Sequence, residues 1–244
     1  MEYADFLRAR REEILARMGA AISKSGRTWA DVSLVAVSKT VDVDALLCAL
    51  RVGYRHFGEN RPQELVRKLD ALALEGDLPP YRFDMIGNLQ TNKINAVLGR
   101  AELIHSIGSL HLAQAVSSRA ERRMGAGELM RPQPVLLEVN VSGEATKSGF
   151  SPSELVEALP DIVSLCGISP QGLMTMAPRG DKEGARRCFA HLRELRDYLV
   201  SQLPGLSLPE LSCGMSEDFD VALEEGSTIV RLGRVVFDPQ FEVK

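Results

Sequence analysis

The chain has 244 residues, of which 45% are hydrophobic and 25% charged, and this composition is typical of a globular protein that buries a sizeable core. Its 29 basic and 33 acidic residues give a net charge of −4, which does not indicate a nucleic-acid partner. No apolar run approaches the about 20 residues of a membrane span, and the four cysteines form no CxxC pair, so we expect a cytoplasmic protein without a membrane segment, metal site or disulfide.

The chain begins with a helical pattern and then alternates between strand-like and helical segments. Residues 2–22 place Phe6, Ile14 and Met18 at helical spacing. Strand-like runs follow at 33–38, 55–58, 82–87, 102–106, 134–141, 168–174, 208–212 and 228–232. Helical patterns lie between them at 42–52, 60–75, 90–99, 109–124, 151–164, 181–202 and 216–225. This alternation predicts an α/β fold, a single (β/α)₈ TIM barrel over residues 1–244, in which the extra N-terminal helix covers the gap after the eighth strand.

The first strand-like run is a continuous apolar stretch at 34–37, which is typical of a strand buried on both faces. It ends on Ser38, Lys39 and Thr40. Lys39 would therefore lie at the carboxyl end of a barrel strand, where this fold places its ligands. Burial and nearby cations lower the pKa of such an amine and suit it to Schiff-base chemistry. The alternative is a solvated lysine at the start of a loop.

The next three strands also end in polar residues. Asn60 is followed by Pro62 and Gln63 in a pattern that resembles a capping box, and a ligand role for Asn60 is compatible with capping. Gly87 would let a ligand approach the backbone. A lone histidine at the end of a strand is more often packed than catalytic, so we assign no role to His105.

The loop after the fifth strand and the end of the sixth strand each have two interpretations. Residues 142–150 contain two glycines and Lys147, so this loop either closes over an anion or is an ordinary polar loop. Met174 and Met176 either pack against an aromatic ring of a ligand or fill the core. These segments alone do not decide the chemistry.

Small residues follow the seventh strand, where positions 212–216 are Ser-Cys-Gly-Met-Ser. A helix is predicted from Glu217, with Ser216 as its N-cap. Free backbone N–H groups at a helix N-terminus favour a phosphate, and the phosphate sites of barrels lie after strands seven and eight. Glu217 and Asp218 would repel a phosphate unless they point outward.

The eighth strand ends in two arginines that flank a glycine. Side chains alternate along a strand, so Arg231 should point into the barrel, while Arg234 lies past Gly233 at the rim. These features together fit pyridoxal 5′-phosphate. The lysine on strand one can hold its aldehyde, strands seven and eight can hold its phosphate, and an arginine on strand eight can meet its ring nitrogen.

Seven segments in chain order resemble the pyridoxal phosphate homeostasis protein family, which itself resembles the barrel domain of alanine racemase without that enzyme's second, β domain. The segments are LVAVSKT at 34–40, HFGENRPQEL at 56–65, IGNLQTNK at 86–93, VNVSGEATKSGF at 139–150, GLMTMAP at 172–178, LSCGMSEDFDVALEEGST at 211–228 and VRLGRVVF at 230–237. Because they cover nearly the whole chain, the resemblance is specific.

The resemblance implies a set of cofactor-binding residues. They are the Schiff-base lysine Lys39, a ring-nitrogen partner at Arg231, pocket residues Asn60 and Met174, and phosphate contacts around Ser212, Gly214, Ser216, Gly233 and Arg234. Four positions depart from the family. Arg234 stands where threonine is usual and Asp238 where glycine is usual, and Asn88 and Cys213 also replace commoner residues. The guanidinium of Arg234 can therefore either bind the phosphate or turn to solvent.

The resemblance further implies a pyridoxal phosphate carrier without robust catalysis, whose recipients would be pyridoxal phosphate-dependent apoenzymes. Because the sequence shows no strong extra apolar surface helix, we expect a monomer. A racemase of this type needs a base on each face of the cofactor ring, and one base comes from the missing β domain. The alternatives are a weak amino-acid racemase that uses Lys39 and Lys147 as its bases, or a cofactor-free Schiff-base aldolase.

Overall fold

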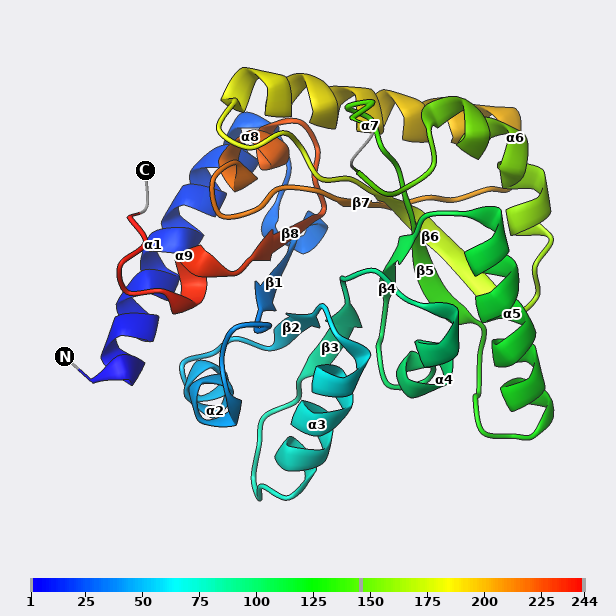
Figure 1. Ribbon diagram of the computed structural model, residues 1–244. Coiled ribbons are helices and arrows are strands. Elements are labelled where there is room, and N and C mark those ends of the chain that lie inside the picture. The colour runs from blue at the N-terminus through cyan, green and yellow to red at the C-terminus, as the bar shows by residue number, and fades with distance from the viewer. Residues whose placement is uncertain (1, 145–146, 243–244) are drawn as a thin grey trace.

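The computed structural model describes residues 2–144 and 147–242, and its centre is a closed barrel of eight parallel strands (Figure 1). Each strand pairs with the next along the chain, and β8 pairs with β1, with Ser33 opposite Ile229. The strands are β1 (Ser33–Val37), β2 (His56–Glu59), β3 (Arg82–Met85), β4 (Ile104–Ile107), β5 (Gln133–Glu138), β6 (Ile168–Met174), β7 (Glu210–Ser212) and β8 (Ile229–Leu232). The predicted TIM barrel is confirmed.

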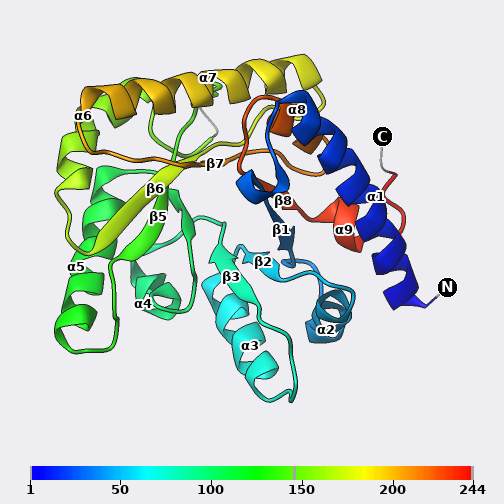
Figure 2. The ribbon, with the colours of Figure 1, turned by 180° about the vertical axis from the view of Figure 1, so that it is seen from behind.

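Helices surround the barrel, as the views from the front and from behind show (Figure 2). They are α1 (Tyr3–Lys24), η1 (Trp29–Asp31), α2 (Val43–Arg51), α3 (Pro62–Ala73), η2 (Thr91–Lys93), α4 (Ile94–Val97), α5 (Leu110–Gly125), α6 (Pro152–Val163), α7 (Lys182–Gln202), α8 (Phe219–Glu224) and α9 (Arg234–Phe237). Side-chain caps fix several starts, because Asp42, Ser109 and Asp181 each accept a bond from a backbone N–H of the first turn. No helix in the described ranges has the length and apolarity that a membrane span requires.

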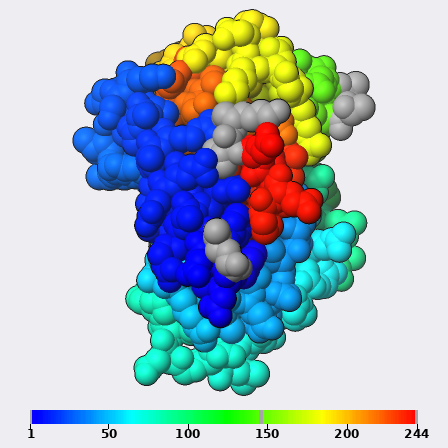
Figure 3. Space-filling model, turned by 90° about the vertical axis from the view of Figure 1, so that its left-hand side faces the viewer, coloured from blue at the N-terminus to red at the C-terminus, as the bar shows by residue number. Residues whose placement is uncertain are grey.

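The N-terminal helix occupies the position that the short α9 leaves open, as predicted. It packs against α2, α8 and α9, and Tyr3 donates its hydroxyl hydrogen to the carbonyl of Phe237. Arg10 likewise donates to the carbonyl of Val235. Figure 3 shows α1, in dark blue, beside the red C-terminal segment. The first and last parts of the chain therefore close the ring of helices together.

Two predicted helix starts are wrong. Asn60 does not cap α3, because the N-cap is Arg61 and no side chain bonds there. Ser216 does not cap α8, which begins at Phe219 with Asp218 as its N-cap. The hydroxyl oxygen of Ser216 instead accepts from the backbone N–H of Val235, on the neighbouring α9. In both cases the capping residue was placed too early, because the strand-to-helix loop is longer than the sequence pattern suggested.

The interior of the barrel contains both an apolar cluster and buried polar side chains. Val35, Leu136, Met174 and Ile229 form a small buried cluster that is separate from the larger core between strands and helices. Buried polar residues also come from strands that are not neighbours: His105 of β4 bonds to Ser212 of β7 across the interior. The barrel interior is therefore filled partly by apolar side chains and partly by polar side chains that bond to one another.

Candidate functional site

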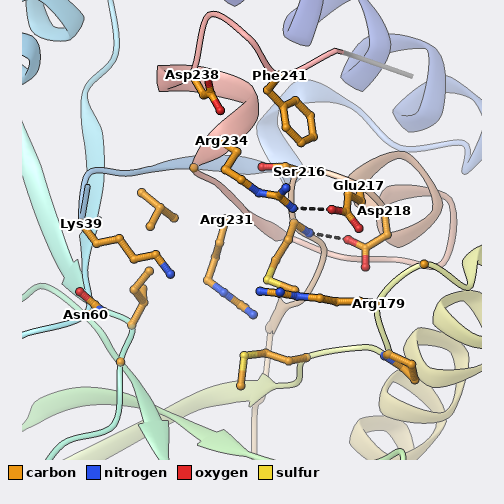
Figure 4. Close-up of a pocket in the computed structure, with 18 of the residues that line it drawn as sticks. Lys39, Asn60, Arg179, Ser216, Glu217, Asp218, Arg231, Arg234, Asp238 and Phe241 are labelled. Atoms are coloured by element: carbon orange, nitrogen blue, oxygen red, sulfur yellow. Dashed lines mark hydrogen bonds and ion pairs between the residues drawn. The ribbon is translucent and has the colours of Figure 1, made fainter. Parts of the chain in front are cut away.

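A cavity of about 1260 Å³ lies at the carboxyl ends of the strands. Seven of the residues predicted to bind the cofactor line it: Lys39, Asn60, Met174, Ser216, Arg231, Gly233 and Arg234. Met174 and Arg231 belong to β6 and β8, and the other five lie in the segments that follow β1, β2, β7 and β8. Segments that are far apart in the sequence therefore meet around one space (Figure 4).

Lys39 lies two residues after the end of β1, and its side chain extends into the cavity toward Arg231 (Figure 4). Among the described residues, its amine makes no hydrogen bond or ion pair. Behind it the backbone is held firmly, because Lys68 donates to the carbonyl oxygen of Ser38 at 2.6 Å. The Ser38 hydroxyl donates to Glu59 at 2.7 Å. The chain thus presents an unengaged amine on a fixed backbone, which is what attack on an aldehyde requires.

Backbone N–H groups on two adjacent loops form a candidate anion site. Within the described residues, the N–H groups of Ser216, Glu217, Gly233 and Arg234 have no hydrogen-bond acceptor, and these residues all line the cavity. Gly214 shapes the first loop from behind: its φ is +92°, and a Cβ there would lie 2.5 Å from the Cβ of Ala222. Unpaired N–H groups that face a cavity can bind a phosphate through its oxygens.

The two acidic residues beside this site, Glu217 and Asp218, are engaged in contacts with other protein groups. Glu217 forms an ion pair with the guanidinium of Arg234, which also lies over the ring of Phe241. Asp218 accepts the backbone N–H of Met215 at 2.6 Å, and burial raises the pKa of its carboxyl. Figure 4 draws both contacts. The expected repulsion of a phosphate by Glu217 is therefore reduced by the charge of Arg234.

Arg231 points into the barrel, as the alternation of β8 predicted, and is only 5% exposed. Its Nη1 donates to the carbonyl and the hydroxyl oxygens of Ser212, at 2.8 and 2.5 Å, and its Nη2 donates to the carbonyl of Thr175 at 3.0 Å. An arginine has five N–H donors. The Nε–H and the second hydrogen of Nη2 have no acceptor among the described residues, so they can bind a ligand in the cavity.

The sequence did not identify Glu138 as a site residue. It is the last residue of β5, lines the cavity and accepts a hydrogen bond from the hydroxyl of Ser148 at 2.9 Å. Burial raises the pKa of its carboxyl, although Ser148 and Arg231 oppose that effect. In the sequence, Glu138 lay inside the strand predicted at 134–141, and only the earlier end of β5 in the structure places it at a strand end. Residues 145–146 of that loop lie outside the described residues.

Two predicted binding residues, Ser212 and Gly214, do not line the cavity and instead support residues that do. Arg179 and Phe241, which were not predicted, are part of its wall. Gly87 was expected to let a ligand approach the backbone, but it is the backbone of Asn60 that lies close to it. A Cβ at position 87 would lie 2.3 Å from the carbonyl oxygen of Asn60.

The donor set fits an aromatic aldehyde that carries a phosphate and a ring nitrogen. Lys39 supplies the amine, the loops after β7 and β8 supply unpaired N–H groups, and Arg231 supplies donors that need an acceptor. The cavity is also large enough for a small aromatic ligand.

Comparison with known proteins agrees with this chemistry. The family model for the N-terminal domain of alanine racemase matches residues 15–239. A relative from Aquifex aeolicus, named pyridoxal phosphate homeostasis protein, is 39% identical over 229 residues, which are 93% of this chain and 96% of the relative.

Solved structures share the barrel as well. PipY of Synechococcus elongatus, solved with pyridoxal phosphate bound, is 32% identical with a TM-score of 0.80, over 95% of this chain and 99% of PipY. An alanine racemase of Clostridium difficile has a TM-score of 0.71 at 15% identity, over 98% of this chain but only 59% of the racemase. The racemase is therefore evidence for the fold alone.

Proposed function

The chain belongs to the pyridoxal phosphate homeostasis protein family, and we propose that it binds pyridoxal 5′-phosphate as a Schiff base on Lys39 and takes part in the intracellular homeostasis of this cofactor. The observation that carries the proposal is the meeting of three groups in one cavity. These are the unengaged amine of Lys39, the unpaired N–H groups of the loops after β7 and β8, and the free donors of Arg231.

Each residue binds the group of the cofactor that suits its chemistry. Lys39 bonds to the aldehyde carbon, which holds the ligand covalently but reversibly. The N–H groups around Ser216 and Gly233 bind the phosphate. Arg231 donates to the ring nitrogen, and because an arginine only donates, that nitrogen stays an unprotonated acceptor. Asn60 and Met174 form part of the cavity wall.

Covalent labelling tests the role of Lys39. Borohydride reduction of the protein with bound pyridoxal phosphate, followed by peptide mapping, should place the pyridoxyl group on Lys39. Lys39→Ala should abolish the label. Lys182→Ala is the matched control, since Lys182 lines the same cavity but pairs with Asp220 at 3.3 Å, and it should leave labelling intact. Labelling of another lysine in the wild-type protein would refute the assignment.

We further propose that the protein has no robust catalytic activity. A racemase needs a second base, and Lys147 is poorly placed for that role because its amine pairs with Glu144 at 2.6 Å and donates to the carbonyl of Met176 at 3.1 Å. An unprotonated ring nitrogen also makes the cofactor a weaker electron sink. Incubation with L-alanine should leave its optical rotation unchanged. A loss of rotation that Lys39→Ala prevents would favour the racemase instead.

We propose one domain over residues 1–244, a cytoplasmic location and transfer of the cofactor to apoenzymes that depend on it. All eight strands belong to one barrel, and none of the four cysteines is in a disulfide. A reversible bond to Lys39 allows release as well as storage. Mixing the loaded protein with an apoenzyme and following the recovery of activity tests the transfer.

A further inference from the structure

A continuous row of hydrogen bonds crosses the barrel interior and ends at Arg231. From Arg231 the row passes to the hydroxyl of Ser212, at 2.5 Å, and from there to Nδ1 of His105, at 2.9 Å. Nε2 of His105 lies 2.9 Å from Oδ2 of Asp84, and the same oxygen lies 2.6 Å from Nε2 of His56. The row joins strands β8, β7, β4, β3 and β2 and belongs to no pattern that the sequence displays.

Arg231 can only donate hydrogen bonds and the Asp84 carboxylate can only accept them. These two groups decide the direction of the bonds in the row. Arg231 has only donors, so the Ser212 oxygen accepts from it, and the hydrogen of the Ser212 hydroxyl finds its acceptor in Nδ1 of His105. Nδ1 of His105 is then an acceptor, and Nε2 carries the hydrogen that the Asp84 carboxylate accepts. His105 is therefore a neutral imidazole of one defined tautomer. If Nδ1 were protonated, two donors would meet at the Ser212 oxygen and the Ser212 hydrogen would lose its acceptor.

The surroundings of His105 favour this neutral state. The ring is fully buried, and the groups that face it are Asp84 on β3, Ser212 on β7, Arg231 on β8 and His56 on β2. Burial lowers the pKa of His105, Asp84 opposes the decrease, and Arg231 and His56 add to it. The positive charge of Arg231 thus disfavours protonation of His105, the residue at the other side of Ser212.

We propose that His105 is a positioning residue for Arg231, which it holds through the Ser212 hydroxyl so that the two free donors of the guanidinium face the ligand cavity. Three of the five Arg231 donors are bound to Ser212 and Thr175, and the remaining two are directed by those bonds. The inference rests on the proposed function, because the ring nitrogen of pyridoxal phosphate is the acceptor that these two donors would meet.

The tautomer of His105 can be measured without any ligand. In the full-length protein with ¹⁵N-labelled histidine, NMR should show Nδ1 of His105 without a hydrogen and Nε2 with one. The ring should become protonated only at a lower pH than a free imidazole, whose pKa is about 6.5. A hydrogen on Nδ1 at neutral pH, or titration of His105 near the free value, would overturn the proposed direction of the row.

Two substitutions then separate a hydrogen-bond role from a packing role. His105→Phe removes the acceptor for Ser212, and we expect about tenfold weaker binding of pyridoxal phosphate, with a shifted absorption maximum. His105→Asn offers an amide oxygen near the position of Nδ1 and should bind within about twofold of wild type, since the link to Ser212 is kept. Ser117→Ala is the control: it removes an equally buried hydroxyl, which bonds to the N–H of Gly167 at 2.9 Å, and it should bind like wild type.

The outcomes distinguish this inference from the proposed function. Equal losses in His105→Phe and His105→Asn, with none in Ser117→Ala, would mean that His105 acts by its shape. Binding and spectrum like wild type in both variants would also overturn the proposal. If the wild-type protein binds no pyridoxal phosphate, the proposed function fails and the ligand part of this inference fails with it, while the NMR result still decides the Ser212–His105 bond.

Discussion

Arg231 and Arg234 stand three residues apart, and the structure gives them different surroundings. Arg231 is buried and bonds to Ser212 and Thr175. Arg234 is more than half exposed, and its guanidinium pairs with Glu217 rather than pointing into the anion site. An exposed ion pair contributes about 0–1 kcal/mol. The backbone N–H of Arg234, which any residue but proline supplies, remains available to a phosphate.

The two arginines should therefore respond differently to substitution. Arg234→Thr should weaken binding of pyridoxal phosphate by less than about fivefold, or 1 kcal/mol, because the N–H groups are kept. Arg231→Gln should shift the absorption spectrum of the bound cofactor and weaken binding more, since a charged hydrogen bond contributes about 1.5–3 kcal/mol. Spectrophotometric titration of both variants tests this. An unchanged spectrum and affinity for Arg231→Gln would remove the proposed ring contact.

Buried ionisable groups in the barrel should make the protein less stable in acid. The pKa of His105 is lowered chiefly by burial, so its contribution is complete above about pH 6.5 and is lost as pH falls below that value. The pKa of Asp84 is also lowered, because its bonds to His105 and His56 outweigh the effect of burial. Its contribution is present above about pH 3.8 and is lost as the pH falls further.

The first of these two windows can be assigned to a residue. Below about pH 6.5, His105→Asn should reduce the slope of unfolding free energy against pH by at most about 1.4 kcal/mol per unit, the value for one proton. Urea unfolding at several pH values measures the slope. His191→Asn, which changes an exposed histidine, is the control and should leave the slope unchanged. The same slope in His105→Asn as in wild type would contradict the assignment.

At the scale of elements, a buried ion pair connects α3 to the ends of β1 and β2. The Lys68 side chain is 1% exposed, and its amine donates to Glu59 at 2.5 Å and to the carbonyl of Ser38 at 2.6 Å. The second carboxylate oxygen of Glu59 is buried without a partner in the described part of the chain. The position of Lys39, the next residue after Ser38, therefore depends on a contact made by a helix behind the barrel wall.

Breaking this pair should be costly. Lys68→Met would leave the Glu59 carboxylate buried without a counter-ion and should destabilise the fold by about 3–5 kcal/mol, as measured by urea unfolding. Adding Glu59→Gln should recover part of the loss, since the uncompensated charge is removed. Arg67→Met, one position earlier on α3, breaks an exposed pair with Glu64 and should cost at most about 1 kcal/mol. Equal costs for Lys68→Met and Arg67→Met would refute this account.

At the scale of the whole molecule, the exposed apolar side chains suggest that the protein is a monomer. The large ones in the described ranges are isolated from one another along the chain: Trp29, Leu74, Met130, Val163, Met176 and Tyr198. A stable interface needs about 800 Å² from each partner, and we predict that single exposed residues separated along the chain do not supply it. Sedimentation equilibrium should therefore give 26.7 kDa at all concentrations. A mass that rises toward twice this value would indicate a dimer.

The sequence by itself determined the barrel and the position of Lys39. Both depend on local patterns: apolar runs that alternate with helical periodicity, and a lysine directly after the first of those runs. Alternation along β8 also predicted that Arg231 points inward. These inferences succeed because strand and helix formation follow the burial of side chains at regular spacing, which neighbouring residues already specify.

Only the tertiary structure decided which polar groups meet. Asn60 and Ser216 were suitable caps by sequence, but the N-caps lie one and two residues later, at Arg61 and Asp218, and Ser216 bonds to α9 instead. His105 and Ser212 are 107 residues apart, and closure of the barrel brings them together across its interior. A buried polar group must find a partner wherever the fold supplies one, so its contacts are set by the assembled barrel and not by its neighbours in the chain.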